Sequence, residues 1–149
     1  MSEKNFQMKQ NNGNLLEATV LVVEDMDNLR AQMIKDLRSL GFKGKIVEAV
    51  GVESAIQVVK TEKIAFFISD WNLLDGTGLI FLKKIRATPN YANTPFVMCT
   101  TKSEVGSVLE AVQAGANDYI VKPWTVDELK KKVFSTWDTY QKNVKFKPA

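Results

Sequence analysis

Reactive polar side chains follow four separate apolar segments of this 149-residue sequence. They are Glu24 and Asp25 after VLVV, Asp70 after FFIS, Thr100 after FVMC, and Lys122 after YIV. If the four segments are parallel strands, their carboxyl ends share one edge of a sheet, with about 4.8 Å between neighbouring strands. Three carboxylates, one hydroxyl and one ammonium group would then meet in a single pocket.

Such a pocket has a defined chemistry. Three carboxylates repel one another by about 4 kcal/mol per pair at a separation near 4 Å when the effective dielectric constant is 20. A nearby cation is needed to keep them ionised, and Lys122 or a hard divalent ion such as Mg²⁺ would serve. The Thr100 hydroxyl and the Lys122 ammonium suit an anion with several oxygens, such as a phosphoryl group. The set therefore indicates formation of an aspartyl phosphate on Asp70.

Each of these residues also has an ordinary structural interpretation. The alternatives are a turn residue at Asp70, an acidic helix start at Glu24 and Asp25, a helix cap at Thr100, and a surface lysine at Lys122. For the site to be absent, these alternatives must hold at four strand ends together. The joint pattern therefore favours a site.

The rest of the sequence predicts strands and helices in strict alternation. Continuous apolar runs, typical of strands buried on both faces of a parallel sheet, occur at residues 18–25, 45–49, 63–70, 94–101 and 118–123. Apolar residues at helical spacing occur at residues 27–40, 52–60, 79–85, 103–114 and 125–140. Five β-α units with short links predict an α/β fold, a doubly wound parallel sheet covered by helices on both faces.

Composition narrows the class of protein. The length suits one domain, and 45% hydrophobic and 25% charged residues are ordinary values for a globular protein. No apolar run approaches the roughly 18 residues that cross a bilayer, and the N-terminus lacks the apolar stretch of a secretory signal. Cys99 is the only cysteine, so no internal disulfide can form and a reducing cytoplasm is expected. The absence of histidine excludes Ser-His-Asp and Cys-His nucleophiles and histidine-ligated zinc.

The net charge of +3 arises near the C-terminus. Residues 19–138 contain fifteen basic and fifteen acidic side chains, and Lys142, Lys145 and Lys147 supply the excess. Three lysines are too short a cluster to indicate a nucleic-acid or membrane partner. The expected organisation is a flexible polar leader at residues 1–17, one domain at residues 18–141, and a basic tail at residues 142–149.

Longer stretches around the polar residues resemble a known family. They are, in chain order, VLVVEDMDNLR, FFISDWNLLDGTGLIFLKKIR, PFVMCTT and AVQAGANDYIVKPWT. Over about residues 18–141 the sequence resembles the receiver domain of two-component response regulators, and within that family the single-domain chemotaxis regulators most of all. The resemblance implies a flavodoxin-like (βα)5 sheet with strand order 2-1-3-4-5 in a single domain.

The resemblance also implies a phosphorylation site with a bound metal. Asp70 would be the phosphoacceptor. The implied ligands of Mg²⁺ are Asp70 itself, Asp25, Glu24 (through water) and the backbone carbonyl of Asn72.

Other residues would sense the phosphoryl group. By resemblance, Thr100 would turn inward to bond the phosphoryl oxygens, and Lys122 would neutralise them. Tyr119 would follow Thr100 and reshape the output surface, where Tyr119 and Trp124 are the partner-contact candidates. Pro123 would form the Lys-Pro bond of the family, which is often cis.

Four positions depart from the family pattern. Glu24 stands where the chemotaxis regulators have the first aspartate of an Asp-Asp pair, a common variant that lengthens one carboxylate arm. Leu74 stands where proline is common, which predicts a less rigid loop after Asp70. Lys102 stands where the chemotaxis regulators have an acidic residue, and together with Asn72 it would modulate the lifetime of the phosphoryl group. Thr101 is bulkier than the usual residue and would narrow access to Asp70.

These expectations describe a stand-alone response regulator. A sensor histidine kinase would phosphorylate Asp70 with Mg²⁺ as cofactor, and a phosphatase could remove the group. The protein would catalyse only these reactions of its own side chain and would not otherwise be an enzyme. Output would pass by direct contact with a protein such as the flagellar motor switch protein, without nucleic acid or membrane insertion. We expect a monomer in the cytoplasm.

Other functions fit the sequence less well. A phosphorelay shuttle or adaptor receiver is the nearest alternative, and the sequence separates it poorly from a motor-binding regulator. An inactive structural receiver is disfavoured because all five site residues are present. A Mg²⁺-dependent phosphohydrolase acting through Asp70 would need a second aspartate at the position of Asn72 and a cap insertion.

Overall fold

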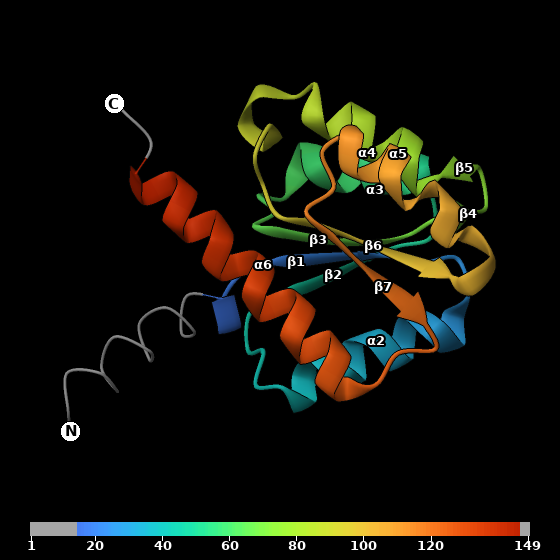
Figure 1. The fold of residues 1–149 in the computed structure, drawn as a ribbon, viewed down its shortest axis with the longest axis horizontal. Helices are drawn as coiled ribbons and strands as arrows, with labels where there is room; N and C mark the ends of the chain where they lie inside the picture. The colour runs from blue at the N-terminus through green and yellow to red at the C-terminus, as the bar shows by residue number, and fades with distance from the viewer. Residues whose placement is uncertain (1–14, 147–149) are drawn as a thin grey trace.

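The computed structural model describes residues 15–146, and its central feature is a five-stranded parallel sheet (Figure 1). In spatial order the strands are β2 (Ile46–Ala49), β1 (Val20–Val23), β3 (Phe66–Asp70), β6 (Phe96–Thr101) and β7 (Asp118–Lys122). A separate antiparallel hairpin, formed by β4 (Asn72–Leu73) and β5 (Gly76–Thr77), follows β3. Without that hairpin the strand order is the predicted 2-1-3-4-5, so the flavodoxin-like α/β fold is confirmed.

Helices cover both faces of the sheet. One face carries α3 (Val52–Thr61), α4 (Gly78–Arg86) and α5 (Val108–Gln113), and the other carries α2 (Asp27–Ser39) and α6 (Val126–Phe146) (Figure 1). A 3₁₀ turn, η1 (Pro89–Tyr91), links α4 to β6. Leu21 and Val23 enter the core beneath α3 and α4, whereas Val20 and Val22 enter the core beneath α2 and α6. This two-sided burial is why the strands read as unbroken apolar runs. In the described part of the chain, no helix combines the length and apolar character needed to cross a membrane.

Aromatic contacts anchor the strand that ends at Asp70. The ring centroid of Phe67 lies 5.7 Å from that of Phe96 on the neighbouring strand and 5.8 Å from that of Phe81 on α4. Tyr91 makes a third contact with Phe67, at 5.4 Å. Such pairs contribute about 0.5–1.5 kcal/mol each beyond the burial of their area, so they help to fix β3 in place.

The segment after β6 differs from the predicted single helix over residues 103–114. It is a 3₁₀ helix, η2 (Lys102–Ser107), followed by the short helix α5. The Glu104 carboxylate accepts two hydrogen bonds from Thr101, one from the hydroxyl at 2.7 Å and one from the backbone N–H at 3.4 Å. These bonds tighten the first turn of η2. Gly106 also disfavours a regular helix at this point.

Both predicted domain boundaries lie inside ordered structure. Helix α6 continues to Phe146, into the predicted basic tail, because no glycine or proline occurs between residues 124 and 147. Leu15, which the sequence assigns to the flexible leader, is fully buried in the core beneath α2 and α6. The folded part therefore begins by residue 15, and residues 1–14 of the leader lie outside the described residues.

The loop after Asp70, in which Leu74 replaces the usual proline, forms the β4–β5 hairpin. Leu74 lies at its turn and is 78% exposed. The next residue, Asp75, accepts hydrogen bonds from the backbone N–H groups of Val52 and Glu53 at 2.7 and 3.0 Å. These groups belong to the first turn of α3 and have no intrahelical acceptor, so Asp75 caps that helix. The cap ties the hairpin to α3 and restrains the loop that the sequence predicts to be less rigid.

Candidate functional site

Asp70 lies at the carboxyl end of β3, a strand whose five residues are all buried. Its Oδ1 accepts a hydrogen bond from the backbone N–H of Trp71 at 2.8 Å and lies 2.7 Å from Nζ of Lys122, at the end of β7. The same ammonium donates a hydrogen bond to Oε1 of Glu24 at 2.7 Å. Lys122 therefore joins carboxylates from two strands. The following peptide bond, Lys122–Pro123, is cis, the form that the resemblance implies.

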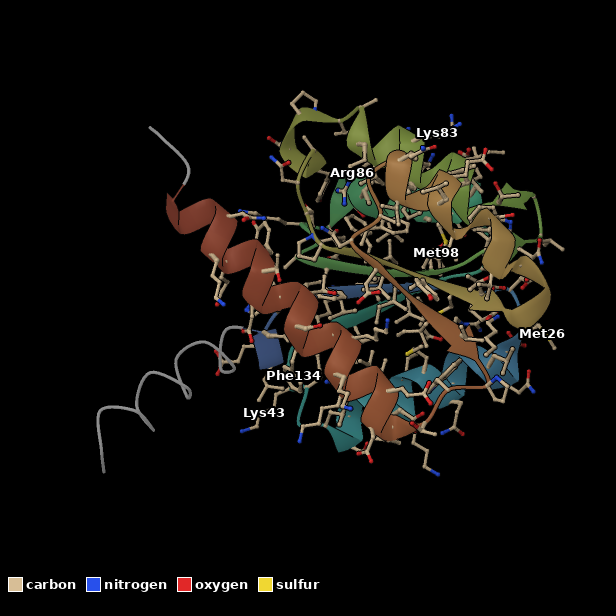
Figure 2. All side chains as sticks on the ribbon, viewed as in Figure 1. Met26, Lys43, Lys83, Arg86, Met98 and Phe134 are labelled. Atoms are coloured by element: carbon tan, nitrogen blue, oxygen red, sulfur yellow. The ribbon has the colours of Figure 1, made fainter. Side chains whose placement is uncertain are left out.

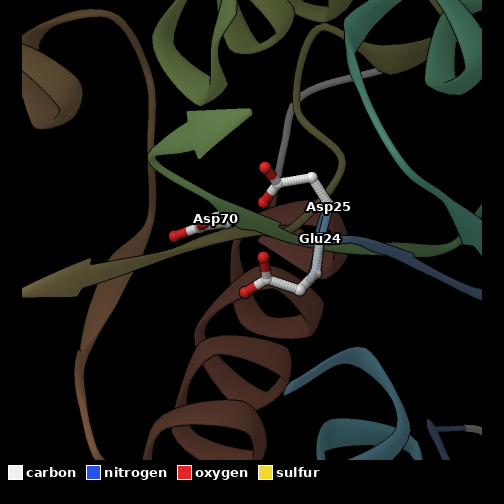
Figure 3. Close-up of side chains that lie close together, drawn as sticks. All are labelled: Glu24, Asp25 and Asp70. Carbon is white, nitrogen blue, oxygen red and sulfur yellow. The ribbon is translucent and has the colours of Figure 1, made fainter. Parts of the chain in front are cut away.

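Glu24, Asp25 and Asp70 form one acidic cluster. One oxygen of each carboxylate lies within 4.8 Å of the others. Figure 3 shows the three side chains grouped at the ends of β1 and β3. Figure 2 places Met26, the residue after the acidic pair, at the edge of the molecule where β6 and β7 end. Hard oxygen donors at this spacing fit a divalent ion such as Mg²⁺.

Burial governs the electrostatics of the cluster. It raises the pKa of Asp70 and of Glu24, although the hydrogen bonds from Lys122 oppose the rise. Burial alone would lower the pKa of Lys122, but its hydrogen bonds to the two carboxylates outweigh that effect and the pKa is raised. The lysine therefore stays protonated, but its single positive charge faces three carboxylates. A bound divalent cation would supply that charge.

The two predicted switch residues lie on the same face of the sheet. Thr100 is 1% exposed and follows Met98 by two positions in β6, and Met98 pairs with Tyr119 of β7. Since strand side chains alternate between faces, Thr100 and Tyr119 point to the side of α3, α4 and α5. The Thr100 hydroxyl donates a hydrogen bond to the Thr101 carbonyl at 3.3 Å. The half-buried Tyr119 ring has Nζ of Lys132 at 4.7 Å from its centroid.

Asn72 is bound by a residue that the sequence did not single out. Its Nδ2 donates a hydrogen bond to Oε2 of Glu104 at 2.8 Å, and Oε1 of the same carboxylate accepts from the Thr101 hydroxyl. Glu104, which lies in η2, thus bridges β4 and the end of β6. The signal that could have identified it is the capping-box pattern Thr-x-x-Glu at these two positions. The side chain of Lys102, the other predicted lifetime modulator, lies outside the described residues.

Trp124 makes a structural contact. Its Nε1 donates a hydrogen bond to Oδ2 of Asp36 on α2 at 2.8 Å, and Gln32 donates to Oδ1 at 2.8 Å. Asp36 is only 7% exposed, and the indole packs against the core beneath α2 and α6. The sequence places Trp124 among the partner-contact candidates, whereas the structure uses its polar atom to satisfy a buried carboxylate.

Comparison with known families agrees with this fold. The family described as the response regulator receiver domain matches residues 20–134. The match covers most of the chain, and the chain therefore belongs to the response regulator receiver domain family. The resemblance found in the sequence is confirmed.

Chemotaxis proteins are among the relatives of the chain. It is 37% identical over 114 residues to the chemotaxis protein CheY homolog of Campylobacter jejuni, across 76% of this chain and 88% of the relative. It is 33% identical to the chemotaxis protein CheY of Pseudomonas aeruginosa, across 76% of this chain and 91% of the relative. Among solved structures, the chemotaxis response regulator CheY4 of Vibrio cholerae has a TM-score of 0.74 and 28% identity, covering 80% of this chain and 98% of that chain. The similarity thus extends over nearly the whole length of these single-domain proteins.

Proposed function

We propose that this protein is a response regulator that accepts a phosphoryl group on Asp70 from a histidine kinase and signals by phosphorylation-dependent protein binding. The observation that carries the proposal is the placement of the Asp70 carboxylate. It lies 2.7 Å from Nζ of Lys122 and in one cluster with Glu24 and Asp25. A buried nucleophile beside a cation and further metal-ligating carboxylates suits phosphoryl transfer.

In the proposed transfer step, a carboxylate oxygen of Asp70 attacks the phosphorus of a phosphohistidine on the kinase. The P–N bond breaks as the P–O bond forms, and the histidine nitrogen keeps the electron pair and takes up a proton. Lys122 is placed to stabilise the negative charge that spreads over the phosphoryl oxygens. When bound by Glu24, Asp25, Asp70 and the Asn72 carbonyl, Mg²⁺ would add positive charge at the same oxygens.

The output of the proposed switch begins at Thr100. Its hydroxyl donates a long, 3.3 Å hydrogen bond to a backbone carbonyl, and a charged phosphoryl oxygen is a stronger acceptor. If Thr100 turns toward Asp70, Tyr119 on the same face can follow it and change the surface around α5 and α6. Leu109 and Val112 of α5 are 67% and 50% exposed and offer apolar contacts on this surface.

Chemotaxis is the proposed setting, and the relatives named CheY support it. The target would then be a flagellar motor switch protein in the cytoplasm. The protein would catalyse only the phosphorylation and dephosphorylation of its own Asp70, without acting on an external substrate.

Chemical phosphorylation tests the role of Asp70. Acetyl phosphate or phosphoramidate with Mg²⁺ should add one phosphoryl group to the wild-type protein, as read by intact mass. Asp70→Asn should add none, whereas Asp138→Asn, the same substitution at an exposed position on α6, should behave as wild type. Absence of addition to the wild type, or equal addition to Asp70→Asn, rejects the assignment.

Binding experiments test whether the protein acts in chemotaxis by binding a motor switch protein. A peptide from a motor switch protein should bind at least about tenfold more tightly when beryllofluoride and Mg²⁺ occupy the site, since the ligand must favour the switched state to shift the population. An affinity that does not respond to beryllofluoride points to a different partner.

A further inference from the structure

One carboxylate bridges the segments that follow the phosphoacceptor and the switch threonine. Glu104 accepts a hydrogen bond from Nδ2 of Asn72 at 2.8 Å and another from the Thr101 hydroxyl at 2.7 Å. Asn72 lies two residues after Asp70, and Thr101 directly follows Thr100. The bridge therefore connects the segment that follows Asp70 with the residue that follows Thr100.

The bridge is a specific restraint. Its acceptor is a carboxylate, and hydrogen bonds to an ionised group are roughly twice as strong as those between neutral groups. Glu104 is half-buried, and its hydrogen bonds to Thr101 are partly shielded from solvent, whereas its hydrogen bond to Asn72 is exposed. Oε2 accepts from Asn72 in β4 and Oε1 accepts from Thr101 at the end of β6, so a movement of either residue relative to Glu104 disturbs the carboxylate that both share.

The proposed switch requires movement on one side of this bridge. The Thr100 hydroxyl donates to the Thr101 carbonyl, and it must leave that acceptor to reach a phosphoryl group on Asp70. Thr101 is the next residue of the backbone, and both its hydroxyl and its N–H lie within hydrogen-bonding distance of Glu104. A shift of the backbone at Thr100 and Thr101 therefore works against the bridge.

We propose that Glu104 is a positioning residue that acts as a latch: it holds Asn72 and Thr101 in the unphosphorylated arrangement and opposes the switch. This inference rests on the proposed phosphorylation of Asp70. A phosphoryl group carries close to two negative charges, while the Asp70 carboxylate loses its own charge as the acyl phosphate forms, so the site gains about one negative charge and several acceptor oxygens. The added charge repels the Glu104 carboxylate, and the phosphoryl oxygens compete for the hydrogen-bond donors of Asn72 and Thr101. Phosphorylation itself therefore favours the release of Glu104 from these two residues.

Beryllofluoride with Mg²⁺, a non-covalent mimic of the phosphoryl group, provides the test. Its apparent affinity is measured by tryptophan fluorescence, because Trp71 adjoins Asp70. Glu104→Ala removes the latch and should tighten binding about tenfold, which corresponds to about 1.4 kcal/mol no longer opposing the switch. Glu104→Gln keeps an oxygen acceptor but loses the charge, and should tighten binding by about threefold. The matched control Glu110→Ala, with the same loss of charge at an exposed position on α5, should leave the affinity unchanged.

A gain in affinity separates a latch from a residue that only stabilises the fold. Loss of a purely structural contact would leave the affinity unchanged or weaken it, and either result in both Glu104 variants overturns the proposal. If Glu104→Ala does not fold, an unchanged affinity in Glu104→Gln is sufficient to overturn it.

A second measurement needs no phosphoryl mimic. The side-chain amide resonances of Asn72 should shift and exchange with solvent faster in Glu104→Ala than in the wild type, and Glu110→Ala should match the wild type. Unchanged Asn72 resonances contradict the latch whether or not Asp70 is phosphorylated. Failure to phosphorylate wild-type Asp70 is a separate result and contradicts the proposed function.

Discussion

Nζ of Lys122 lies 2.7 Å from Oδ1 of Asp70, although β6 separates the strands that carry the two residues. The register places Asp70 beside Cys99, and Cys99 beside Ile120. Lys122 therefore starts two residues beyond the level of Asp70, and its long side chain reaches back over the edge of the sheet. The ion pair thus depends on strand register as well as on residue identity.

Removing this cation should destabilise the metal-free protein. Lys122→Met leaves the carboxylates of Asp70 and Glu24 buried without their shared partner, and breaking such a pair costs about 3 kcal/mol. Urea unfolding measures the loss. Saturating Mg²⁺ should restore part of it, because the ion replaces the missing positive charge. Lys130→Met, at an exposed position on α6, should change the free energy of unfolding by less than about 0.5 kcal/mol. Equal stability of the two variants without metal would show that the ion pair is not stabilising.

The acidic cluster predicts opposite pH dependences for stability and for metal binding. The ordinary pKa values are 3.8 for Asp70 and 4.5 for Glu24, and burial raises both in the folded state. The folded protein therefore binds these protons more tightly than the unfolded chain. Without metal, the free energy of unfolding should fall as pH rises from the ordinary pKa values through the raised ones. The affinity for Mg²⁺ should rise over the same interval, since ionised carboxylates bind the ion.

Thermal unfolding at a series of pH values, with and without Mg²⁺, measures how stability and Mg²⁺ affinity depend on pH. Asp70→Asn removes one of the two titrating carboxylates and should weaken both pH dependences. A metal-free wild type that becomes more stable with rising pH across this interval, relative to Asp70→Asn, contradicts the expectation.

Gly78 is required by a close approach of two backbone segments. A Cβ at this position would lie 2.3 Å from the carbonyl oxygen of Asp70 and 2.7 Å from Sδ of Met98. Gly78→Ala should therefore lower the free energy of unfolding by more than about 3 kcal/mol or prevent folding. In Gly106→Ala the new Cβ would meet no atom within 4 Å, so this control should be neutral or slightly stabilising. Thermal melts followed by circular dichroism compare the two, and a Gly78→Ala variant as stable as the control would contradict the close approach.

Trp124→Phe tests whether the indole is structural or binds a partner. The substitution keeps most of the ring but removes the hydrogen bond to the buried carboxylate of Asp36, which should cost about 1–2 kcal/mol. Urea unfolding should detect this loss, while the affinity for the output partner stays within experimental error of the wild type. Unchanged stability with weaker partner binding would instead support the contact role expected from the sequence.

The strands could be predicted from local pattern because both faces of the sheet are covered. Residues 20–23 and 66–68 are apolar throughout, since alternate side chains enter two different cores. Helix ends were less predictable. The hydrogen bond of Glu104 to Asn72, 32 residues earlier in the chain, and the burial of Leu15 depend on neighbours that the local pattern does not include.

Trp124 shows where residue type alone leaves a role open. A tryptophan after the last strand is typical both of a partner contact and of a core residue, and the sequence does not say where its Nε1 points. The position of α2 relative to the loop after β7 decides this, because it brings Asp36 to 2.8 Å from the indole nitrogen.

By itself, the sequence determined the α/β fold and the set of polar groups at one edge of the sheet, because apolar runs and the ends of parallel strands follow from local pattern and simple topology. Only the tertiary structure decided which of these groups are bonded to each other. It joined Lys122 to both Asp70 and Glu24, and it joined Glu104 to Asn72. Side-chain hydrogen bonds depend on distances and angles that hold within a few tenths of an ångström. Strand register and loop packing set those distances, and neither is encoded in the spacing of residues along the chain.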